Sequence, residues 1–243
     1  MKRGQFSHFR PQIARLERRL FLKQGLSLGA LSLLSGCTLK DDDAVDRLLF
    51  AISRFNDKMQ AALFDPARLA PTYAENDIAA PFPFNAYYEE KDVPRIDGED
   101  YRLQLSGLIA DKRPWSLAQL RALPQSSQIT RLVCVEGWSA IGEWRGVAFR
   151  HFLERIGADL TARYVGFKCA DKYYSSIDMP SALHPQTLLA LDFADVKYGY
   201  PLRLRIPTKL GFKNPKFIHE IFVSNDYPGG YWEDKGYNWF SGS

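Results

Sequence analysis

The chain has 243 residues, 46% of them apolar, which is enough for a substantial core in one large domain or two small ones. Its formal net charge of +4 suggests an anionic partner, but seven of the 32 basic residues lie within residues 1–36 beside a single acid. The remaining 25 basic and 27 acidic residues nearly balance, so charge gives no indication of nucleic-acid binding.

Residues 1–36 have the pattern of an export signal. Arg18 and Arg19 form a twin-arginine motif, and an apolar run follows from Gly25 to Gly36. That run is too short to cross a bilayer, which needs roughly 20 apolar residues. The alternative is a basic amphipathic surface helix. The twin-arginine route resembles the one used by proteins that are exported folded, so the pattern predicts a periplasmic protein that receives a cofactor before export.

The run ends in Leu34-Ser35-Gly36-Cys37, which resembles a lipobox. Cys37 would then be acylated and become the mature N-terminus, and two or three acyl chains would hold the protein on a membrane. The alternative is ordinary cleavage that leaves Cys37 without a role.

Residues 37–80 are expected to form a tether, an amphipathic helix and a wrapping segment. Residues 38–44 are polar, residues 45–64 have apolar side chains at helical spacing, and residues 65–83 are rich in Pro and Ala. We expect the apolar face of the helix to pack on the body rather than dock on a partner.

Residues 81–243 are predicted to form an α+β catalytic domain with mixed sheets and short helices. Strand patterns outnumber helix patterns and lack regular helical crossovers, which argues against a doubly wound parallel sheet. The expected strands cover 101–107, 131–135, 164–169, 202–206 and 217–223, and the expected helices cover 116–120 and 147–156.

Cys134 is the candidate metal ligand. If Cys37 is acylated, Cys134 and Cys169 remain, and they could form a disulfide in an oxidising compartment. Cys134 has no second Cys within three residues and no His nearby, so zinc, iron–sulfur and covalent haem sites are poorly supported. A single thiolate suits a metal whose other ligands come from a cofactor.

Two arginines and three lysines form the candidate anion site. Arg203 and Arg205 alternate with apolar residues, and if they face the core they need an anion to offset their desolvation. Lys209, Lys213 and Lys216 follow closely. The alternative is a solvated strand face and a lysine-rich turn. The chain has neither a Walker loop nor a Rossmann glycine fingerprint, which disfavours ATP and dinucleotides.

Five segments resemble the sulfite-oxidase-like molybdopterin oxidoreductases in order and spacing, and within that family the catalytic subunits of periplasmic methionine sulfoxide reductases. They are residues 85–89, 131–138 with Trp144, 199–204, 209–216 and 230–237. The resemblance covers roughly residues 80–240 and implies a molybdenum–molybdopterin cofactor.

The resemblance also implies roles for individual residues. Cys134 would ligate molybdenum, and Glu136 would be a catalytic acid or base, or else a structural acid. The cofactor-binding residues would be Asn85, Tyr88, Glu89, Cys169, Tyr198, Arg203, Asn214 and Lys216. Two of these depart from the methionine sulfoxide reductase pattern, since Cys169 stands where Thr is usual and Tyr198 where Asn is usual. These departures weaken the assignment of substrate.

The expected reaction is oxygen-atom transfer, first the reduction of a sulfoxide and second the oxidation of sulfite. The chain has no haem or iron–sulfur motif of its own, so electrons would come from another protein, such as a membrane b-type cytochrome. A metal-free lipoprotein that binds ligands on the same fold is the alternative from another class.

Overall fold

The computed structural model describes residues 42–193 and 195–242. The twin-arginine motif and Cys37 lie outside the described residues. Among the described residues, those from Ile52 onward form one compact unit, and residues 42–51 belong to another. No helix among the described residues is long and apolar enough to cross a membrane.

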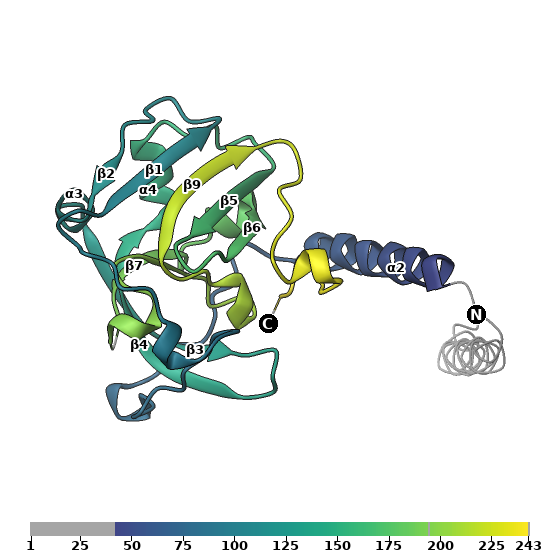
Figure 1. Ribbon diagram of the computed structural model, residues 1–243, viewed down its shortest axis with the longest axis horizontal. Coiled ribbons are helices and arrows are strands. Elements are labelled where there is room, and N and C mark those ends of the chain that lie inside the picture. The colour runs from purple at the N-terminus through teal and green to yellow at the C-terminus, as the bar shows by residue number, and fades with distance from the viewer. Residues whose placement is uncertain (1–41, 194, 243) are drawn as a thin grey trace, which may run out of the picture. The chain divides into compact units, whose positions relative to one another are not determined.

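The compact unit contains two sheets. The first has the strand order β2-β1-β9-β5-β6, with β9 between β1 and β5 (Figure 1). Strand β1 runs parallel to β9, and the other pairs are antiparallel. The bounds are β1 Arg102–Gly107, β2 Trp115–Ser116, β5 Tyr164–Cys169, β6 Tyr174–Asp178 and β9 Ile218–Ser224.

The second sheet is antiparallel throughout, with the order β3-β4-β7-β8. Its strands are β3 Gln125–Val133, β4 Ser139–Ala148, β7 Leu188–Asp192 and β8 Arg203–Arg205. The two sheets and their short helices confirm the predicted α+β class.

The helices of the compact unit are short. They are α3 Leu117–Arg121, α4 Phe149–Arg155 and α5 Met179–Ala182, together with the 3-10 turns η1 Glu75–Asp77, η2 Glu90–Asp92, η3 Val196–Tyr198, η4 Gly211–Lys213 and η5 Glu233–Lys235. Helix α3 begins where the sequence predicts, because the Ser116 hydroxyl accepts a hydrogen bond from the Gln119 amide. Helix α4 starts two residues later than expected, because β4 continues through Ala148.

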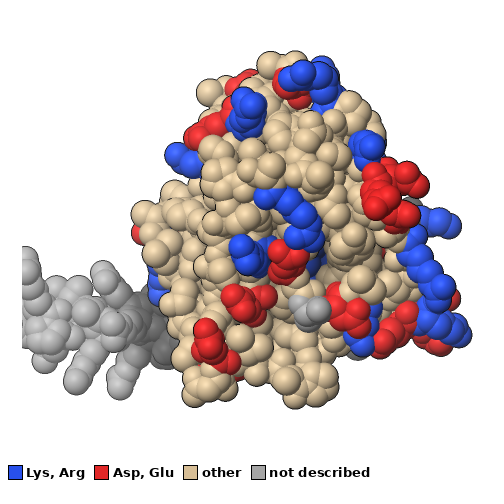
Figure 2. Space-filling view, turned by 90° about the vertical axis from the view of Figure 1, so that its left-hand side faces the viewer, with Lys and Arg blue, Asp and Glu red and all other residues tan. Residues whose placement is uncertain are grey.

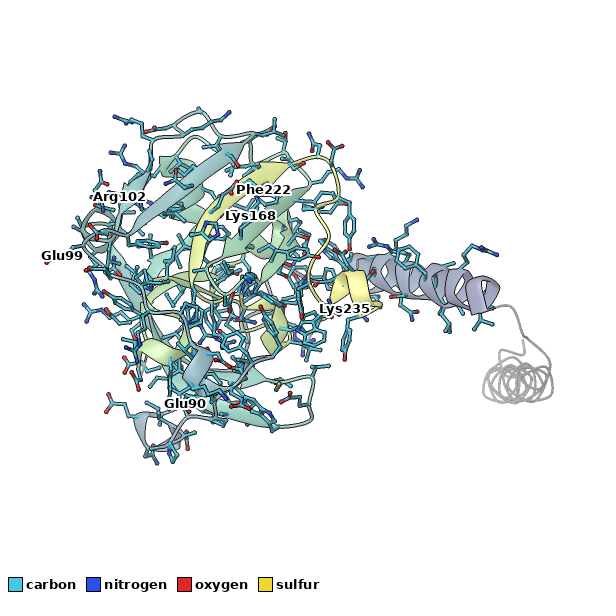
Figure 3. The ribbon with its side chains drawn as sticks, viewed as in Figure 1. Glu90, Glu99, Arg102, Lys168, Phe222 and Lys235 are labelled. Atoms are coloured by element: carbon cyan, nitrogen blue, oxygen red, sulfur yellow. The ribbon has the colours of Figure 1, made fainter. Side chains whose placement is uncertain are left out.

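One apolar core joins the two sheets. It includes Leu103 on β1, Val165 on β5, Ile221 on β9 and Leu189 on β7, together with Phe152 on α4, and each is buried. Charged side chains of both signs lie interspersed on the face that Figure 2 shows. Lys168 on β5, for example, lies beside β9, where it pairs with Glu220 at 2.9 Å and lies 5.7 Å from the ring of Phe222 (Figure 3).

Helix α2 spans Asp42–Leu63, so it starts three residues before and ends one residue before the predicted 45–64, and its expected orientation is wrong. We expected its apolar face to pack on the body. Instead Phe55 is 62% exposed and Met59 45% exposed, while Asp57 is buried and accepts a hydrogen bond from the Phe240 amide at 2.7 Å. Polar contacts therefore join this part of the helix to the body.

Candidate active site

The turn between β3 and β4 presents Cys134. The thiol follows the last residue of β3 rather than lying within a strand, so the predicted strand ends one residue before Cys134. The Cys134 amide donates to Trp138 O at 2.9 Å, and the Gly137 amide donates to Cys134 O at 3.2 Å. Gly137 has φ +92°, a left-handed conformation that favours glycine. These bonds fix the turn and the direction of the thiol.

Glu136 lies beside the thiol. Its Oε2 is 3.7 Å from Cys134 Sγ, and the same oxygen accepts a bond from Trp138 Nε1 at 3.0 Å. Burial raises the pKa of the Cys134 thiol, and the neighbouring carboxylate adds to this effect. Cys134 and Cys169 are both free thiols, so the disulfide alternative is absent here. A metal would deprotonate Cys134 on binding.

We call the space in front of this thiol the thiol cavity. It has a volume of about 300 Å³ and is lined by residues 85–88, 134–136, 171, 173, 211, 212, 214–216, 232 and 237. It brings together six of the predicted site residues: Asn85, Tyr88, Cys134, Glu136, Asn214 and Lys216. Four of the five sequence segments that carry the resemblance therefore meet around one thiol.

Lys216 and Asn85 form one wall of the thiol cavity. The Lys216 ammonium donates to Asn85 O, and Asn85 Oδ1 is buried without a partner in the described part of the chain. Burial, reinforced by the nearby Arg203, lowers the pKa of Lys216 to about 7. In the described part of the chain this wall therefore holds a basic side chain without a salt bridge and an oxygen without a hydrogen bond.

Asp171 lines the thiol cavity and was not anticipated from the sequence. It accepts a hydrogen bond from Tyr88 Oη at 2.9 Å and one from the Tyr173 amide at 3.1 Å, while Tyr87 Oη donates to its backbone carbonyl. Burial raises the pKa of its carboxyl. Its position two residues after Cys169 was the only sequence signal.

A second cavity contains Arg203 and Tyr198, and we call it the arginine cavity. It has a volume of about 540 Å³. Arg203 donates through Nη1 to Tyr198 O at 2.6 Å and lies 4.6 Å from the ring of Trp144. Its Nε and Nη2 are buried without a partner among the described residues, and burial lowers its pKa to about 9.

Arg205, two residues along β8, is also fully buried. It donates to Thr130 Oγ1, Asn214 Oδ1 and the carbonyl of Arg131, all of which are neutral. Within residues 42–193 and 195–242, no ion pair to a carboxylate joins either arginine. Two buried guanidiniums without a counter-ion need an anion to offset their desolvation.

Gly199 lies where the two cavities approach each other. A Cβ at this position would be 3.0 Å from the Cβ of Lys216 and 3.1 Å from that of Arg203, and its φ is +123°. Glycine therefore lets the two cations come close together. Two cations, the unpaired donors of Arg203, the unpaired oxygen of Asn85 and one thiol fit a pterin that carries a phosphate at one end and a metal at the other.

Besides Arg203, three other predicted cofactor residues do not line the thiol cavity. Glu89 is exposed and pairs with Lys91 at 2.7 Å. Cys169 is buried and lines a third cavity together with His219. Tyr198 lines the arginine cavity, and its hydroxyl donates to Phe82 O.

Aromatic side chains form the rim of the site. Tyr231 stacks on Tyr87 with ring centroids 4.6 Å apart, and Lys235 lies 3.7 Å from the centre of the Tyr231 ring. Lys235 belongs to η5, near the C-terminus (Figure 3). Trp232 and Tyr237, on either side of η5, line the thiol cavity.

A buried ion pair holds this C-terminal segment in place. Lys213 on η4 donates to Glu233 on η5 and to Ser176 O, and both charged side chains are essentially unexposed. Glu233 also accepts from Ser175 Oγ at 3.0 Å. The pair therefore joins two of the segments that line the thiol cavity.

Several named proteins are similar to this chain in sequence. The putative protein-methionine-sulfoxide reductase subunit YedZ1 of Azospira oryzae is 58% identical over 230 residues, covering 93% of this chain and 88% of its own. The protein-methionine-sulfoxide reductase catalytic subunits MsrP of Ralstonia nicotianae and Xanthomonas axonopodis pv. citri are 30% identical over 200 residues and 36% identical over 145 residues. The chain spans only 60% and 45% of these two proteins.

The fold also has a solved counterpart. The sulfane dehydrogenase SoxCD of Paracoccus pantotrophus superposes with a TM-score of 0.52 over 55% of this chain and 40% of that one, at 18% identity. This likeness shows the fold alone.

The family match covers most of the compact unit. Residues 90–232 match the oxidoreductase molybdopterin binding domain. The match contains the thiol cavity's Cys134, the arginine cavity's Arg203 and the buried Lys216. The chain therefore belongs to the sulfite-oxidase-like family of molybdopterin-dependent oxidoreductases.

Proposed function

We propose that this chain reduces methionine sulfoxide in proteins with a molybdenum–molybdopterin cofactor. The names of the relatives described above point to this substrate. The observation that carries the proposal is the lining of the thiol cavity, where one buried thiol faces aromatic walls and two carboxylates. An apolar methionine side chain with a neutral sulfoxide suits such a lining.

Residues of both cavities would hold the cofactor. Cys134 would ligate molybdenum, Arg203 and Lys216 would bind the phosphate, and Asn85, Tyr88 and Asn214 would hydrogen-bond the pterin. When bound, the group supplies two-electron oxygen-atom-transfer chemistry. By resemblance, Glu89, Cys169 and Tyr198 would also contact the cofactor, and binding would have to reorient the first two side chains.

Glu136 is the proposed proton source. Reduction of a sulfoxide to a thioether consumes two electrons and two protons and releases water, so an acid is needed near the departing oxygen. Trp138 holds the Glu136 carboxyl beside Cys134, at 3.0 Å from its indole nitrogen. This places a protonatable oxygen within 3.7 Å of the thiol that would carry the metal.

Charge disfavours the oxidation of sulfite. Glu136 and Asp171 line the thiol cavity, and Lys216 is its one basic side chain among the described lining residues. Lys216 has a lowered pKa and would be used by the phosphate. An anionic substrate would meet two carboxylates without an arginine to balance them, whereas a neutral sulfoxide would not be repelled.

The proposed setting is the periplasmic face of a membrane. The twin-arginine motif supports export of the folded protein, and the sequence around Cys37 supports a lipid anchor. Electrons would come from a membrane partner such as a b-type cytochrome. In this proposal residues 1–36 are removed, residues 37–80 connect, and residues 81–243 form the catalytic domain.

A reduced-dye assay with the purified, cofactor-loaded protein tests this function. We expect turnover of a peptide that contains methionine sulfoxide, with kcat/KM at least about tenfold above that for sulfite oxidation. Glu136→Gln should lower kcat by about 10²-fold while molybdopterin content stays unchanged. Preference for sulfite, or an unchanged kcat in Glu136→Gln, would contradict the proposal.

A further inference from the structure

Helix α2 has an apolar stripe that faces solvent. Ile52, Phe55, Met59 and Leu63 recur at helical spacing, so they share one face. They are 48%, 62%, 45% and 79% exposed. Leu48, one turn earlier on the same helix, is also exposed and continues the stripe.

The opposite face of the helix is polar and packs on the body. Asp57 is buried and accepts from the Phe240 amide, and the Arg54 guanidinium lies 4.0 Å from the ring of Tyr227. A surface helix normally buries its apolar stripe and exposes its polar face. This helix does the reverse, and a contiguous apolar stripe of this kind marks a contact surface.

The apolar surface continues beyond the helix. Leu69 is 58% exposed and lines a groove of about 630 Å³ together with Leu63 and Phe64. The stripe therefore extends from the helix onto the body beside its C-terminal end, and its occupant must cover both.

The position of the helix in the sequence indicates what covers it. Cys37 and the apolar run that precedes it lie just before Asp42, with four residues between them. Five residue steps of extended chain reach at most about 18 Å. An acyl chain on Cys37, or the apolar run itself, would bring the first turn of α2 to a membrane surface.

We propose that α2 lies along a phospholipid bilayer, with Ile52, Phe55, Met59 and Leu63 buried at the boundary between headgroups and acyl chains. The sequence of α2 contains four Asp, two Arg and one Lys, so it has no excess of positive charge. Binding therefore depends on apolar burial rather than on anionic lipids, and phosphatidylcholine alone suffices. The compact unit would thereby be held at a fixed orientation to the membrane.

The proposal goes beyond the chemistry at Cys134 and shares with the proposed function only the membrane location. Phe55→Glu combined with Met59→Glu should remove the bilayer contact while molybdopterin content and dye-coupled activity remain within about twofold of wild type. Dye-coupled activity therefore tests the proposed function, and the bilayer contact tests the role of α2, so failure of one is distinguishable from failure of the other.

Site-directed fluorescence on the full, cofactor-loaded chain tests the contact. Phe55→Cys and Met59→Cys variants would each carry a polarity-sensitive fluorophore, and the unsubstituted chain would give the background from native thiols. Lys58→Cys is the matched control, because it is exposed on the same helix but lies off the stripe. With phosphatidylcholine vesicles, emission at positions 55 and 59 should rise at least about threefold and be quenched by nitroxide on the acyl chains, with little change at 58.

Three outcomes would overturn the proposal. The first is an equal response, or none, at positions 55, 58 and 59 when vesicles are added. The second is shielding of positions 55 and 59 before any lipid is present, in a protein that elutes as a dimer, which would assign the stripe to a second copy. Shielding in native membranes that contain the redox partner, but not in vesicles, would likewise replace the bilayer with a protein partner.

Discussion

Replacing Lys213 with Met should destabilise the protein strongly. Lys213 and Glu233 form a buried pair, and Glu233 Oε2 already has no partner among the described residues. Without Lys213 the Glu233 carboxylate would keep, among the described residues, only the bond from Ser175 Oγ. Leaving a buried charge without its partner lowers the free energy of unfolding by about 3–5 kcal/mol. This is a large share of the roughly 5–15 kcal/mol by which a domain is stable. For a chain of this length the melting temperature should fall by about 10 °C.

Urea unfolding of the purified chain measures this effect, and the exposed pair of Lys168 with Glu220 is the matched control. Lys168→Met should cost less than about 1 kcal/mol, because solvent screens that pair. The double variant Lys213→Met/Glu233→Gln should recover at least about 1 kcal/mol, since it leaves no buried charge. A Lys213→Met variant that is no less stable than Lys168→Met would refute the reasoning. A double variant whose loss of stability equals the sum of the losses in Lys213→Met and in Glu233→Gln would also refute it.

Three further predictions concern the cofactor site. Cys134→Ala should abolish dye-coupled activity, while the circular dichroism of the cofactor-free chain stays unchanged; retained activity would count against the assignment. Arg203→Met removes a buried cation with unpaired donors, so the cofactor-free variant should be at least as stable to urea as the wild type. The amount of molybdopterin that acid releases from the variant should fall at least about tenfold. Lys216 has its pKa lowered to about 7, so between that pH and about 10.5 the unfolded chain binds more protons and stability should rise with pH. Lys216→Met should make the urea midpoint depend less on pH. If the midpoint of Lys216→Met rises with pH as steeply as that of the wild type, burial does not lower the pKa of Lys216.

Much of the fold follows from local patterns in the sequence. The alternation over residues 101–107 and the Ser116 cap predict β1 and the start of α3, because both signals are local. Strands β4, β6 and β7 were missed. Strand β4 contains Gly142 and Gly146, which weaken a strand pattern. Strands β6 and β7 are short and almost wholly buried, without the alternation of a half-exposed strand. The orientation of α2 depends on a distant partner, the Phe240 amide, which periodicity does not report.

The candidate site was predictable where family segments carry it and not where single side chains complete it. Cys134 and Lys216 lie in segments that resemble the family and line one cavity. Asp171 had no such signal, because it enters the site through hydrogen bonds from tyrosines. The buried pair of Lys213 and Glu233 spans 20 residues of sequence, and nothing local distinguishes these side chains from solvated ones.

The central claim is that the sulfur of Cys134 ligates molybdenum. X-ray absorption at the molybdenum edge of the purified protein tests it, with Cys169→Ser as the matched control because Cys169 is the other free thiol that the structure describes. We predict about one molybdenum per chain in the wild type and in Cys169→Ser, and the loss of one sulfur ligand or of the metal in Cys134→Ser. Full molybdenum content with an unchanged number of sulfur ligands in Cys134→Ser would contradict the account.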